Sequence, residues 1–470
     1  MTTWAAAVVA TIVLAAVACP AHAEHEAKSI VIFVGAGLSP SVVTAARVGR
    51  YKEDGALTID GLPYVARVRT SSLDAQGADS AAAVSAMLTG VKVRNDVVAM
   101  DGNTKSVGFA PGRDPIRNIP GADNRCPANG NGGPSPTLIE LAIAKGKATG
   151  VVTTARLTGA GASSAYAHVC HRDTEYEIAR QAVPGGLGYN DKLGRGVDVM
   201  LGGISTYWRP YEAGKRPRGR ADGRELIGEL QTRGYTYVTD LVSLNAAPAT
   251  ANTKLIGLFD FADGDGPWQG AMSHESDRDP NREPSLAQMT GRALDVLMKN
   301  PAGFVLVVDA DGINSALRGG SARRALADTI ALDDAVKVAI EKVDLGNTIV
   351  IVAGDHATTL AYIGGGRRGV DVLGLQTDPV TGKSLIDSDG NTYTSLVYGT
   401  GPNRPDKRAS LDTPTVLNRD YLQESAIKLP RGMGSSADVV VYATGIGAER
   451  FRGSIDHPKI FTLLRSASDL

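Results

Sequence analysis

Asp79 and Ser80 stand immediately before a run of small residues, AAAVSAMLTG, which predicts a helix. One of the two therefore lies at a helix N-terminus, where free backbone N–H groups and the positive end of the helix dipole favour an anion. A serine hydroxyl at that position could act as a nucleophile that is stabilised as the alkoxide. On this stretch alone, an ordinary helix cap is the simpler interpretation.

A second polar stretch, AYAHVCHRDTEYE, contains His168, His171 and Arg172. An arginine can hold a phosphate through two parallel hydrogen bonds, although Arg172 could equally pair with Asp173 or Glu175. The two histidines are three residues apart. That spacing could suit a metal ion, and it is also common among hydrogen-bonded surface histidines.

A carboxylate and an imidazole, Asp355 and His356, directly follow the apolar run NTIVIVAG. These two side chains at the end of a buried strand would supply half of a zinc site. Two ligands alone do not complete such a site, so further donors would have to come from elsewhere in the chain.

The stretch IVIFVGAGLSP ends a buried apolar run in the turn Gly35-Ala36-Gly37. Glycines at such a turn let the backbone approach a phosphate, as in dinucleotide-binding loops. The third glycine of that motif would fall at Pro40, which has no backbone N–H. The spacing therefore argues against a nucleotide loop.

Strand-like and helix-like segments alternate along most of the chain. The predicted strands cover residues 31–34, 148–154, 303–311 and 347–356, and amphipathic helical segments lie between them. This alternation predicts an α/β fold with a central, mostly parallel sheet and helices on both faces. Ligands bind at the carboxyl ends of strands in such sheets, which is where Asp355 and His356 stand.

Two segments contain many turn-forming residues. Residues 111–136 are rich in glycine, proline and asparagine, and residues 364–412 mix turn signals with short strand-like pieces such as TYTSLVYG. Another local signal is the pair Thr137 and Glu140, whose spacing predicts a capping box at the start of the helix TLIELAIAKGK.

The N-terminus resembles a secretory signal. A short apolar run is followed by Ala21-His22-Ala23, an A-x-A pattern typical of signal peptidase sites, so we expect residues 1–23 to be removed. The mature chain, residues 24–470, would then be periplasmic or secreted, with no span long enough to cross a membrane. A net charge of −1 over 470 residues argues against a nucleic-acid partner.

Cys126 and Cys170 are the cysteines that remain if the first 23 residues are removed. In an oxidising compartment they could form one disulfide, and two unpaired thiols are an equally good interpretation.

Taken together and in this order, the motifs resemble the alkaline phosphatase family. The resemblance extends over nearly the whole mature chain and is carried by the collinear blocks IVIFVGAGLSPSVVTAARV, ADSAAAVSAMLTGVKV, KATGVVTTARLTGAGASSAYAHVCHR, DVMLGG, IGLFDF, EPSLAQMTGRALDVLMKNPAGFVLVVDADGIN and IVIVAGDH. It implies an alkaline-phosphatase-like fold in which residues 364–412 form a small crown-type insertion beside the site.

The resemblance also implies a reaction and roles for particular residues. The family hydrolyses phosphomonoesters through a phosphoserine intermediate, with two zinc ions about 4 Å apart and a nearby magnesium ion. Ser80 matches the nucleophile, Asp79 its usual companion and Arg172 the phosphate clamp. Asp355 and His356 match ligands of the zinc ion on the serine side. The family forms homodimers, which implies pairing with a second copy or with a related chain.

Several positions depart from the family pattern at the metal sites, and most of them lack the donor that the family carries, whereas Asp309 is still an oxygen ligand. The bridging aspartate is replaced by Ala36, and the glutamate of the magnesium site becomes the shorter Asp309. The remaining replacements, at the magnesium site and at the second zinc, are Gly159, Gly161, Asn314, Arg318, Met433 and Gly434.

These departures predict at most one bound metal ion and very low phosphatase activity. A binding or partner role for a phosphate-like anion would fit the Ser80 and Arg172 that remain. The alternative is an active hydrolase rebuilt around a single metal at Ser80, Asp355 and His356. Asp311 is the best nearby substitute ligand. A purely structural surface protein is a third alternative.

Overall fold

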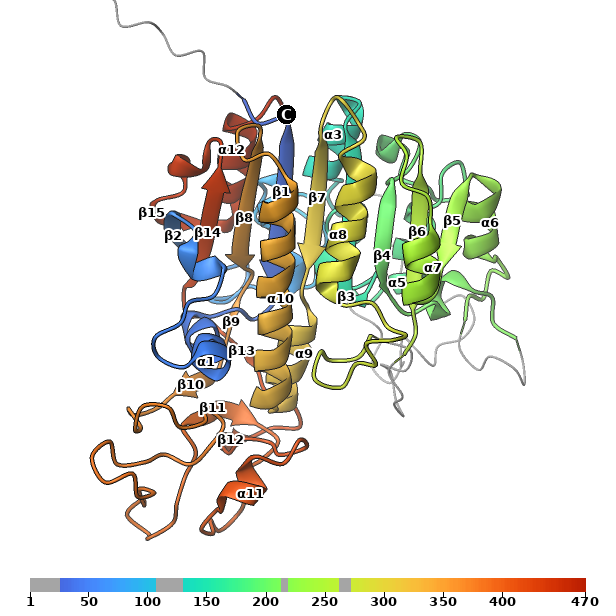
Figure 1. Ribbon diagram of the computed structural model, residues 1–470. Coiled ribbons are helices and arrows are strands. Elements are labelled where there is room, and N and C mark those ends of the chain that lie inside the picture. Colours follow the sequence, from blue (N-terminus) through green and yellow to red (C-terminus); the bar gives the residue numbers. More distant parts are fainter. Residues whose placement is uncertain (1–25, 107–129, 213–218, 262–271) are drawn as a thin grey trace, which may run out of the picture.

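The computed structural model describes residues 26–106, 130–212, 219–261 and 272–470. Within them, a ten-stranded sheet runs in the order β15-β2-β14-β8-β1-β7-β3-β4-β6-β5 (Figure 1). Its strands pair in parallel except where β14 meets β2 and β8. The strands are β1 Ser29–Gly35, β2 Tyr64–Arg69, β3 Ala148–Arg156, β4 Val199–Gly203, β5 Tyr235–Val238, β6 Lys254–Phe259, β7 Phe304–Asp309, β8 Thr348–Gly354, β14 Val439–Gly445 and β15 Gly453–Asp456.

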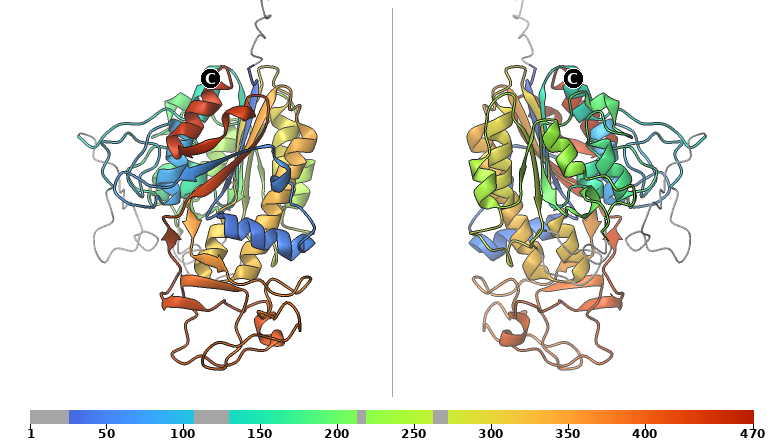
Figure 2. Two further views of the ribbon diagram at one scale, coloured as in Figure 1. Left: turned by 90° about the vertical axis from the view of Figure 1, so that its left-hand side faces the viewer. Right: turned by 90° about the vertical axis from the view of Figure 1, so that its right-hand side faces the viewer.

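Helices cover both faces of this sheet (Figure 2). One face carries α1 Pro40–Tyr51, α7 Leu241–Ala246, α8 Leu286–Leu297 and α10 Ala322–Lys342. The other carries α2 Ser80–Thr89, α3 Leu138–Ala144, α5 Glu175–Gln181, α6 Leu226–Thr232 and α12 His457–Ser466. Two short helices, α4 Ala160–Ser163 and α9 Gly312–Gly319, follow β3 and β7. The predicted α/β class is thus confirmed.

Strand β1 shows why its sequence is apolar throughout. Ile30, Ile32 and Val34 belong to the core on the α2 face, whereas Val31 and Phe33 belong to the core on the α10 face. Because successive side chains of a strand point to opposite faces, a strand that is covered on both sides must be apolar at every position.

The predicted capping box at the start of α3 is present. Thr137 Oγ1 accepts a hydrogen bond from Glu140 N at 3.2 Å, and Glu140 Oε2 accepts one from Thr137 N at 2.8 Å, which is a capping box. Pro40 begins α1. Its missing N–H costs nothing there, because the first N–H groups of a helix have no partner within the helix.

Beyond the carboxyl ends of the main strands, a smaller unit extends from the sheet (orange in Figure 1). It contains the three-stranded sheet β10 Leu360–Tyr362, β11 Leu396–Gly401 and β12 Ser425–Lys428, together with the short helix α11 Thr413–Val416. Isolated bridges such as Ile386 with Thr392 tie the turns between β10 and β11 together. The insertion over residues 364–412 stays a prediction, and those residues lie in this unit.

Three predictions fall on residues that the structure does not describe. They are the signal peptide over residues 1–23, most of the loop over residues 111–136, and Cys126. Cys170 is disulfide-bonded, and its partner lies outside the described residues. Among the described helices, none combines the length and the apolar composition needed to cross a lipid bilayer.

Candidate functional site

Three neighbouring strands of the sheet end at the same edge with polar side chains. In the sheet, β1 lies between β7 and β8, with Val34 opposite Asp309 and Gly35 opposite Gly354. The turn after β1, Asp309 at the end of β7, and Asp355 and His356 after β8 are therefore brought together. This is the carboxyl edge at which parallel sheets bind ligands.

Ser80 is the first residue of α2, and Asp79 caps that helix. Asp79 Oδ1 accepts a hydrogen bond from Ala82 N at 2.9 Å. Ser80 is buried, and its hydroxyl lies close enough to Asp355 to help lower the pKa of that carboxyl group. Asp79 is thus an N-cap, and it also presents Ser80 at the helix N-terminus beside the strand ends.

Arg172 reaches the same place from the chain segment after α4. Its Nη1 donates to Asp79 Oδ2 at 2.9 Å, and its backbone N donates to Asp96 O at 2.7 Å. Arg172 is therefore paired with Asp79. Glu175, one of the two partners that the sequence allowed, is paired instead with Arg156 at 3.0 Å. Burial alone would lower the pKa of Arg172, but the charge and hydrogen bond of Asp79, together with the charges of Asp311 and Asp173, raise that pKa.

Asp355 is fully buried and is held by groups of its own strand end. Its Oδ1 accepts from Gly37 N at 2.8 Å and from His356 N at 2.6 Å, and it lies 2.9 Å from His356 Nδ1. Burial would raise the pKa of Asp355, yet the adjacent His356 lowers it. The pKa of His356 is raised by Asp355 in turn, against the opposing effect of burial. Asp355 Oδ2 has no hydrogen-bond partner within the described residues.

Asp309 lies beside Asp355 and Asp311. Its Oδ2 accepts from Thr153 Oγ1 at 3.0 Å, while its Oδ1 is buried without a partner in the described part of the chain. Burial, followed by the charges of Asp311 and Asp355, raises the pKa of Asp309 well above its ordinary value. A Cβ added at Gly161 would stand 2.6 Å from Asp309 Oδ2, so this packing leaves no room for a side chain there.

Asn314 and Arg318 are four residues apart on α9 and therefore lie on one side of it. Asn314 Nδ2 donates to Asp311 Oδ1 at 3.2 Å, and its Oδ1 lies 3.3 Å from His356 Nε2. The Nε of Arg318 is buried with no hydrogen-bond partner among the described residues. Burial, then the positive charge of Arg172, lowers the pKa of Arg318, so Arg318 lies within electrostatic range of Arg172.

Two further arginines belong to this surrounding and were not predicted from the sequence. Arg156 is the last residue of β3. Arg431 directly precedes Gly432, whose backbone N donates a hydrogen bond to the carbonyl oxygen of Arg318. The pKa of Arg431 is lowered by burial and then by Arg318, with Asp311 and Arg156 also acting on it. The position of Arg156 at a strand end was a usable signal, whereas nothing local marked Arg431.

His168 and His171 do not form a metal pair at this site. His168 Nε2 lies 2.8 Å from Glu140 Oε1, and its Nδ1 lies 2.7 Å from the carbonyl of Ala99. His171 lies 3.9 Å from both Asp96 and Asp173. His168 is thus part of the packing around α3, and the interpretation as a hydrogen-bonded histidine is the one that fits.

His457, the first residue of α12, comes nearer to the site than its place near the C-terminus suggested. It is buried, its Nε2 has no hydrogen-bond partner within the described residues, and burial lowers its pKa to about 4. The charges of Asp355 and His356 both act on that pKa, which places the imidazole within electrostatic range of the strand ends.

The donors at the site do not fit the full metal set that the resemblance implies. No group of three or more His, Cys, Asp or Glu side chains is placed to hold a metal ion within the residues that the structure covers. At the second zinc, Asn314 and Arg318 offer an amide and a fixed cation, and a guanidinium is not a metal ligand. Asp309 Oδ1 and Asp355 Oδ2 have no hydrogen-bond partner among the described residues, so Asp309, Asp355, His356 and Ser80 are the metal donors that stand at these strand ends.

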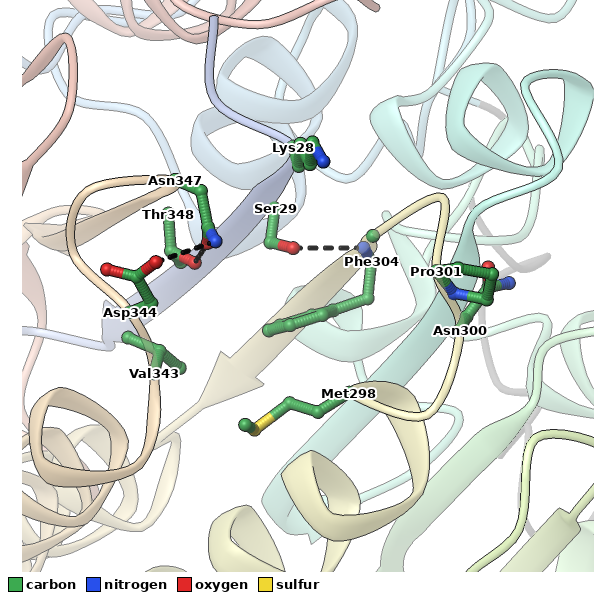
Figure 3. Close-up of a pocket in the computed structure, with 11 residues that line it drawn as sticks. Lys28, Ser29, Met298, Asn300, Pro301, Phe304, Val343, Asp344, Asn347 and Thr348 are labelled. Carbon is green, nitrogen blue, oxygen red and sulfur yellow. Dashed lines mark hydrogen bonds between the residues drawn. The ribbon is translucent and has the colours of Figure 1, made fainter. Parts of the chain in front are cut away.

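Two cavities open elsewhere on the described molecule. One of about 260 Å³ lies at the amino ends of β1, β7 and β8, at the opposite edge of the sheet. Figure 3 shows two hydrogen bonds within its lining, from Phe304 N to Ser29 Oγ and from Asn347 Nδ2 to Asp344 Oδ2. The other, of about 1280 Å³, is lined by the smaller unit around Arg408 and Glu424. Neither contains Ser80 or Arg172.

Comparisons with known proteins agree with the motifs and with the fold. The sequence profile of the family described as alkaline phosphatase matches residues 27–470. The tissue-nonspecific alkaline phosphatase isozyme of Gallus gallus is 31% identical, over 92% of this chain and 82% of that protein. An alkaline phosphatase of Gadus morhua is 29% identical, over 92% of this chain and 89% of that protein.

Solved structures show the same fold. The alkaline phosphatase of Thermus thermophilus superposes with a TM-score of 0.66 at 22% identity, covering 95% of this chain and 92% of that one. The alkaline phosphatase from the Antarctic bacterium TAB5 gives a TM-score of 0.64 at 19% identity, covering 94% and 99%. Because the profile match extends from the start of β1 to the last residue, the chain belongs to the alkaline phosphatase family.

Proposed function

We propose that this protein binds a phosphate or phosphomonoester-like anion at Ser80 and Arg172 and hydrolyses phosphomonoesters very slowly. The observation that supports this most strongly is the place of Arg318. Its buried guanidinium lies within electrostatic range of Arg172 and Asp311, at the position where the resemblance implies a zinc-binding imidazole. A fixed positive charge attracts an anion, but it does not activate water as a metal ion does.

The chain's own residues suffice to bind and orient such an anion. Asp79 holds one edge of the Arg172 guanidinium at 2.9 Å, which leaves its other N–H groups for phosphoryl oxygens. The N-terminus of α2 adds the positive end of a ten-residue helix at Ser80. Asp355 stands beside the Ser80 hydroxyl and is kept ionised by His356.

Slow turnover follows from the number of stabilising groups that have changed. Removing one electrostatic stabiliser of a transition state costs about 10²–10³ in rate. Ala36, Gly161, Asn314 and Arg318 replace donors at several places, so we expect hydrolysis at least about 10³ slower than in a fully ligated relative.

The test is to purify the protein with zinc and magnesium, measure bound metal by elemental analysis, and measure phosphate binding by calorimetry. We expect less than one metal ion per chain, and phosphate binding that disappears in Arg172→Met. Arg368→Gln is the matched control, because that side chain is 67% exposed and pairs with Asp54 on the surface. Phosphate binding that survives in Arg172→Met contradicts the proposal.

A second candidate is an active hydrolase with one metal ion at Ser80, Asp355 and His356. The unpartnered Asp355 Oδ2 favours it, because a buried carboxylate oxygen without a hydrogen bond is costly and a cation would satisfy it. Such an ion would polarise the serine oxygen. Stoichiometric metal, with aryl phosphate hydrolysis that is lost in Ser80→Ala, would establish this candidate and overturn the first.

We also infer that the mature chain is exported and pairs with a second copy or with a related chain. The A-x-A pattern supports export, and the family membership supports pairing. Sequencing of the mature N-terminus should give Glu24, and light scattering on the purified chain should give twice the monomer mass. A retained leader or a monomer would count against the corresponding part.

A further inference from the structure

Residues 94–99 form a short segment that connects α2 with the chain after α4. Val98 and Val169 exchange backbone hydrogen bonds, from Val98 N to Val169 O at 2.9 Å and from Val169 N to Val98 O at 3.1 Å. On the other side of the segment, Ala99 N donates to Oγ of Ser85, a residue of α2, at 2.7 Å. The segment is therefore fixed both to α2 and to the chain after α4.

Within this segment, the backbone of Asp96 contacts both members of the ion pair between Asp79 and Arg172. Asp96 N donates to Asp79 Oδ2 at 3.2 Å, and Asp96 O accepts from Arg172 N at 2.7 Å. Arg172 Nη1 donates to the same Asp79 Oδ2 at 2.9 Å. The neighbouring Asn95 Oδ1 accepts from Asp79 N at 3.0 Å. The main chain of Arg172 is therefore fixed relative to Asp79, which directly precedes Ser80.

Asp96 makes these contacts in a backbone conformation that few side chains adopt. Its φ is 67°, and the nearby Ala99 has a φ of 47°. Asp96 is the third residue of a turn that is closed by a hydrogen bond from Val97 N to Arg94 O at 3.3 Å. A positive φ at the third position of a turn suits glycine and asparagine, and it is strained for a β-branched residue. Since φ sets the angle between the N–H and the C=O of Asp96, both contacts with the ion pair depend on it.

The side chain of Asp96 contributes less than its backbone. Asp96 Oδ2 lies 3.9 Å from His171 Nε2, and the side chain is 45% exposed. A half-exposed pair at this distance is screened by solvent and contributes little. Burial and the charge of Asp79 raise the pKa of the Asp96 carboxyl group, so its negative charge is disfavoured where it lies.

We propose that Asp96 is a positioning residue for the anion pocket, whose left-handed backbone holds Arg172 and Asp79 in the orientation that binds a phosphoryl group beside Ser80. A guanidinium that is fixed before the ligand arrives binds more tightly, because less side-chain freedom is lost on binding. The proposal rests on the anion pocket of the proposed function. It adds a residue that acts on the affinity of that pocket without touching the ligand.

The experiment measures the binding of inorganic phosphate by calorimetry, on the full chain and on variants at Asp96. Asp96→Val should bind phosphate at least about fivefold more weakly, because a β-branched residue shifts the turn and displaces the guanidinium from a charge-assisted hydrogen bond to phosphate. Asp96→Asn and Asp96→Gly should bind phosphate at least as tightly as the wild type. Both residues accept a positive φ, and both remove a negative charge near Arg172.

Lys52→Val is the matched control for backbone strain. Lys52 follows α1 and has a φ of 60°, so the same residue type is placed in a left-handed position outside residues 94–99. Thermal unfolding shows whether each variant is folded, and it should give a lower midpoint than the wild type for both valine variants. Phosphate affinity should be unchanged in Lys52→Val, because its backbone makes no contact with Arg172 or Asp79.

Each other outcome overturns a defined statement. If Asp96→Val binds phosphate as tightly as the wild type, the positioning role fails while the anion pocket stands. If Asp96→Asn and Asp96→Gly are weakened as much as Asp96→Val, the carboxylate acts rather than the backbone, and the proposal fails. If Lys52→Val is weakened equally, the loss reflects general strain and the proposal also fails. If the wild type binds no phosphate, the proposed function fails and the positioning role fails with it.

Discussion

Among single residues, Ala36 has the clearest chemical consequence. It is buried in the turn after β1, close to the strand ends that carry Asp309 and Asp355. The resemblance implies a metal-bridging aspartate at this position. A carboxylate introduced there would meet two carboxylates that are already buried, in a site whose other donors are missing.

We therefore expect that Ala36→Asp alone does not restore phosphatase activity, because Gly159, Gly161, Asn314 and Arg318 are unchanged. The variant should also lose about 3 kcal/mol of stability, since it buries an unpaired charge. Aryl phosphate hydrolysis with zinc and magnesium, together with urea unfolding, measures both effects. Ala36→Asn is the control for side-chain volume. Recovery of phosphatase activity by this single change would show the reasoning to be wrong.

Glu140 and His168 form a buried pair that makes stability depend on pH. Burial would raise the pKa of Glu140, but the hydrogen bond from His168 and its charge lower that pKa below the ordinary 4.5. The carboxylate thus binds protons more readily in the unfolded chain than in the folded one. Its contribution to stability is complete above pH 4.5 and is lost as the pH falls through the lower folded pKa.

His168→Leu should lose about 3 kcal/mol at pH 7, because it leaves the buried carboxylate of Glu140 without its main partner. It should also flatten the decline in stability below pH 4.5. Urea unfolding at a series of pH values measures both effects. Glu341→Gln, which alters an exposed helix pair with Lys337, is the control and should show the wild-type slope. An unaltered acid slope in His168→Leu would refute this account.

At the level of elements, α2 depends on α12, which packs against it near the C-terminus of the chain. Gly90 ends α2 in the left-handed conformation, with φ of 74°, and a Cβ there would lie 2.5 Å from Phe461 Cδ1. Gly146 is also left-handed, with φ of 72°, but no atom lies within 4 Å of an added Cβ. A substitution at Gly146 therefore measures the backbone strain alone, whereas a substitution at Gly90 measures the same strain together with the clash against Phe461.

Gly146→Ala should cost about 1 kcal/mol, the ordinary cost of a left-handed alanine. Gly90→Ala should cost that amount plus about 1–3 kcal/mol, because the methyl group must displace the Phe461 ring from α2. Urea unfolding of the two variants gives the difference. Equal losses in the two variants would mean that α12 does not hold α2 in place.

For the whole molecule, the disulfide of Cys170 allows the cysteine pairing and the predicted removal of residues 1–23 to be tested together. Its partner lies outside the described residues, and we infer that it is Cys126, since Cys19 would leave with residues 1–23. The mature protein should then show no reactive thiol in denaturant before reduction and two after it. Reduction should also lower the thermal midpoint, because it lets the unfolded chain expand. A third thiol would mean that the leader is retained, and reactive thiols before reduction would mean that the pair is open.

The sequence by itself determined the fold class and the local signals. Strands that are apolar at every position, such as β1, require helices on both faces, and the spacing of Thr137 and Glu140 specifies a cap. These features depend on residues that are close in the sequence, so the periodic pattern of apolar and polar residues is enough to predict them. For the same reason, Ser80 and Asp355 could be placed at a helix start and at a strand end.

Only the tertiary structure decided which charged groups meet. The sequence left Arg172 free to pair with Asp173 or Glu175, and the fold gives it Asp79, 93 residues away. It gave no reason to join Arg431 to Arg318, or to bring His457 within electrostatic range of Asp355. Such contacts depend on how strand ends and loops converge at one edge of the sheet. No local pattern records them, because the free energy of a charge depends on everything packed around it.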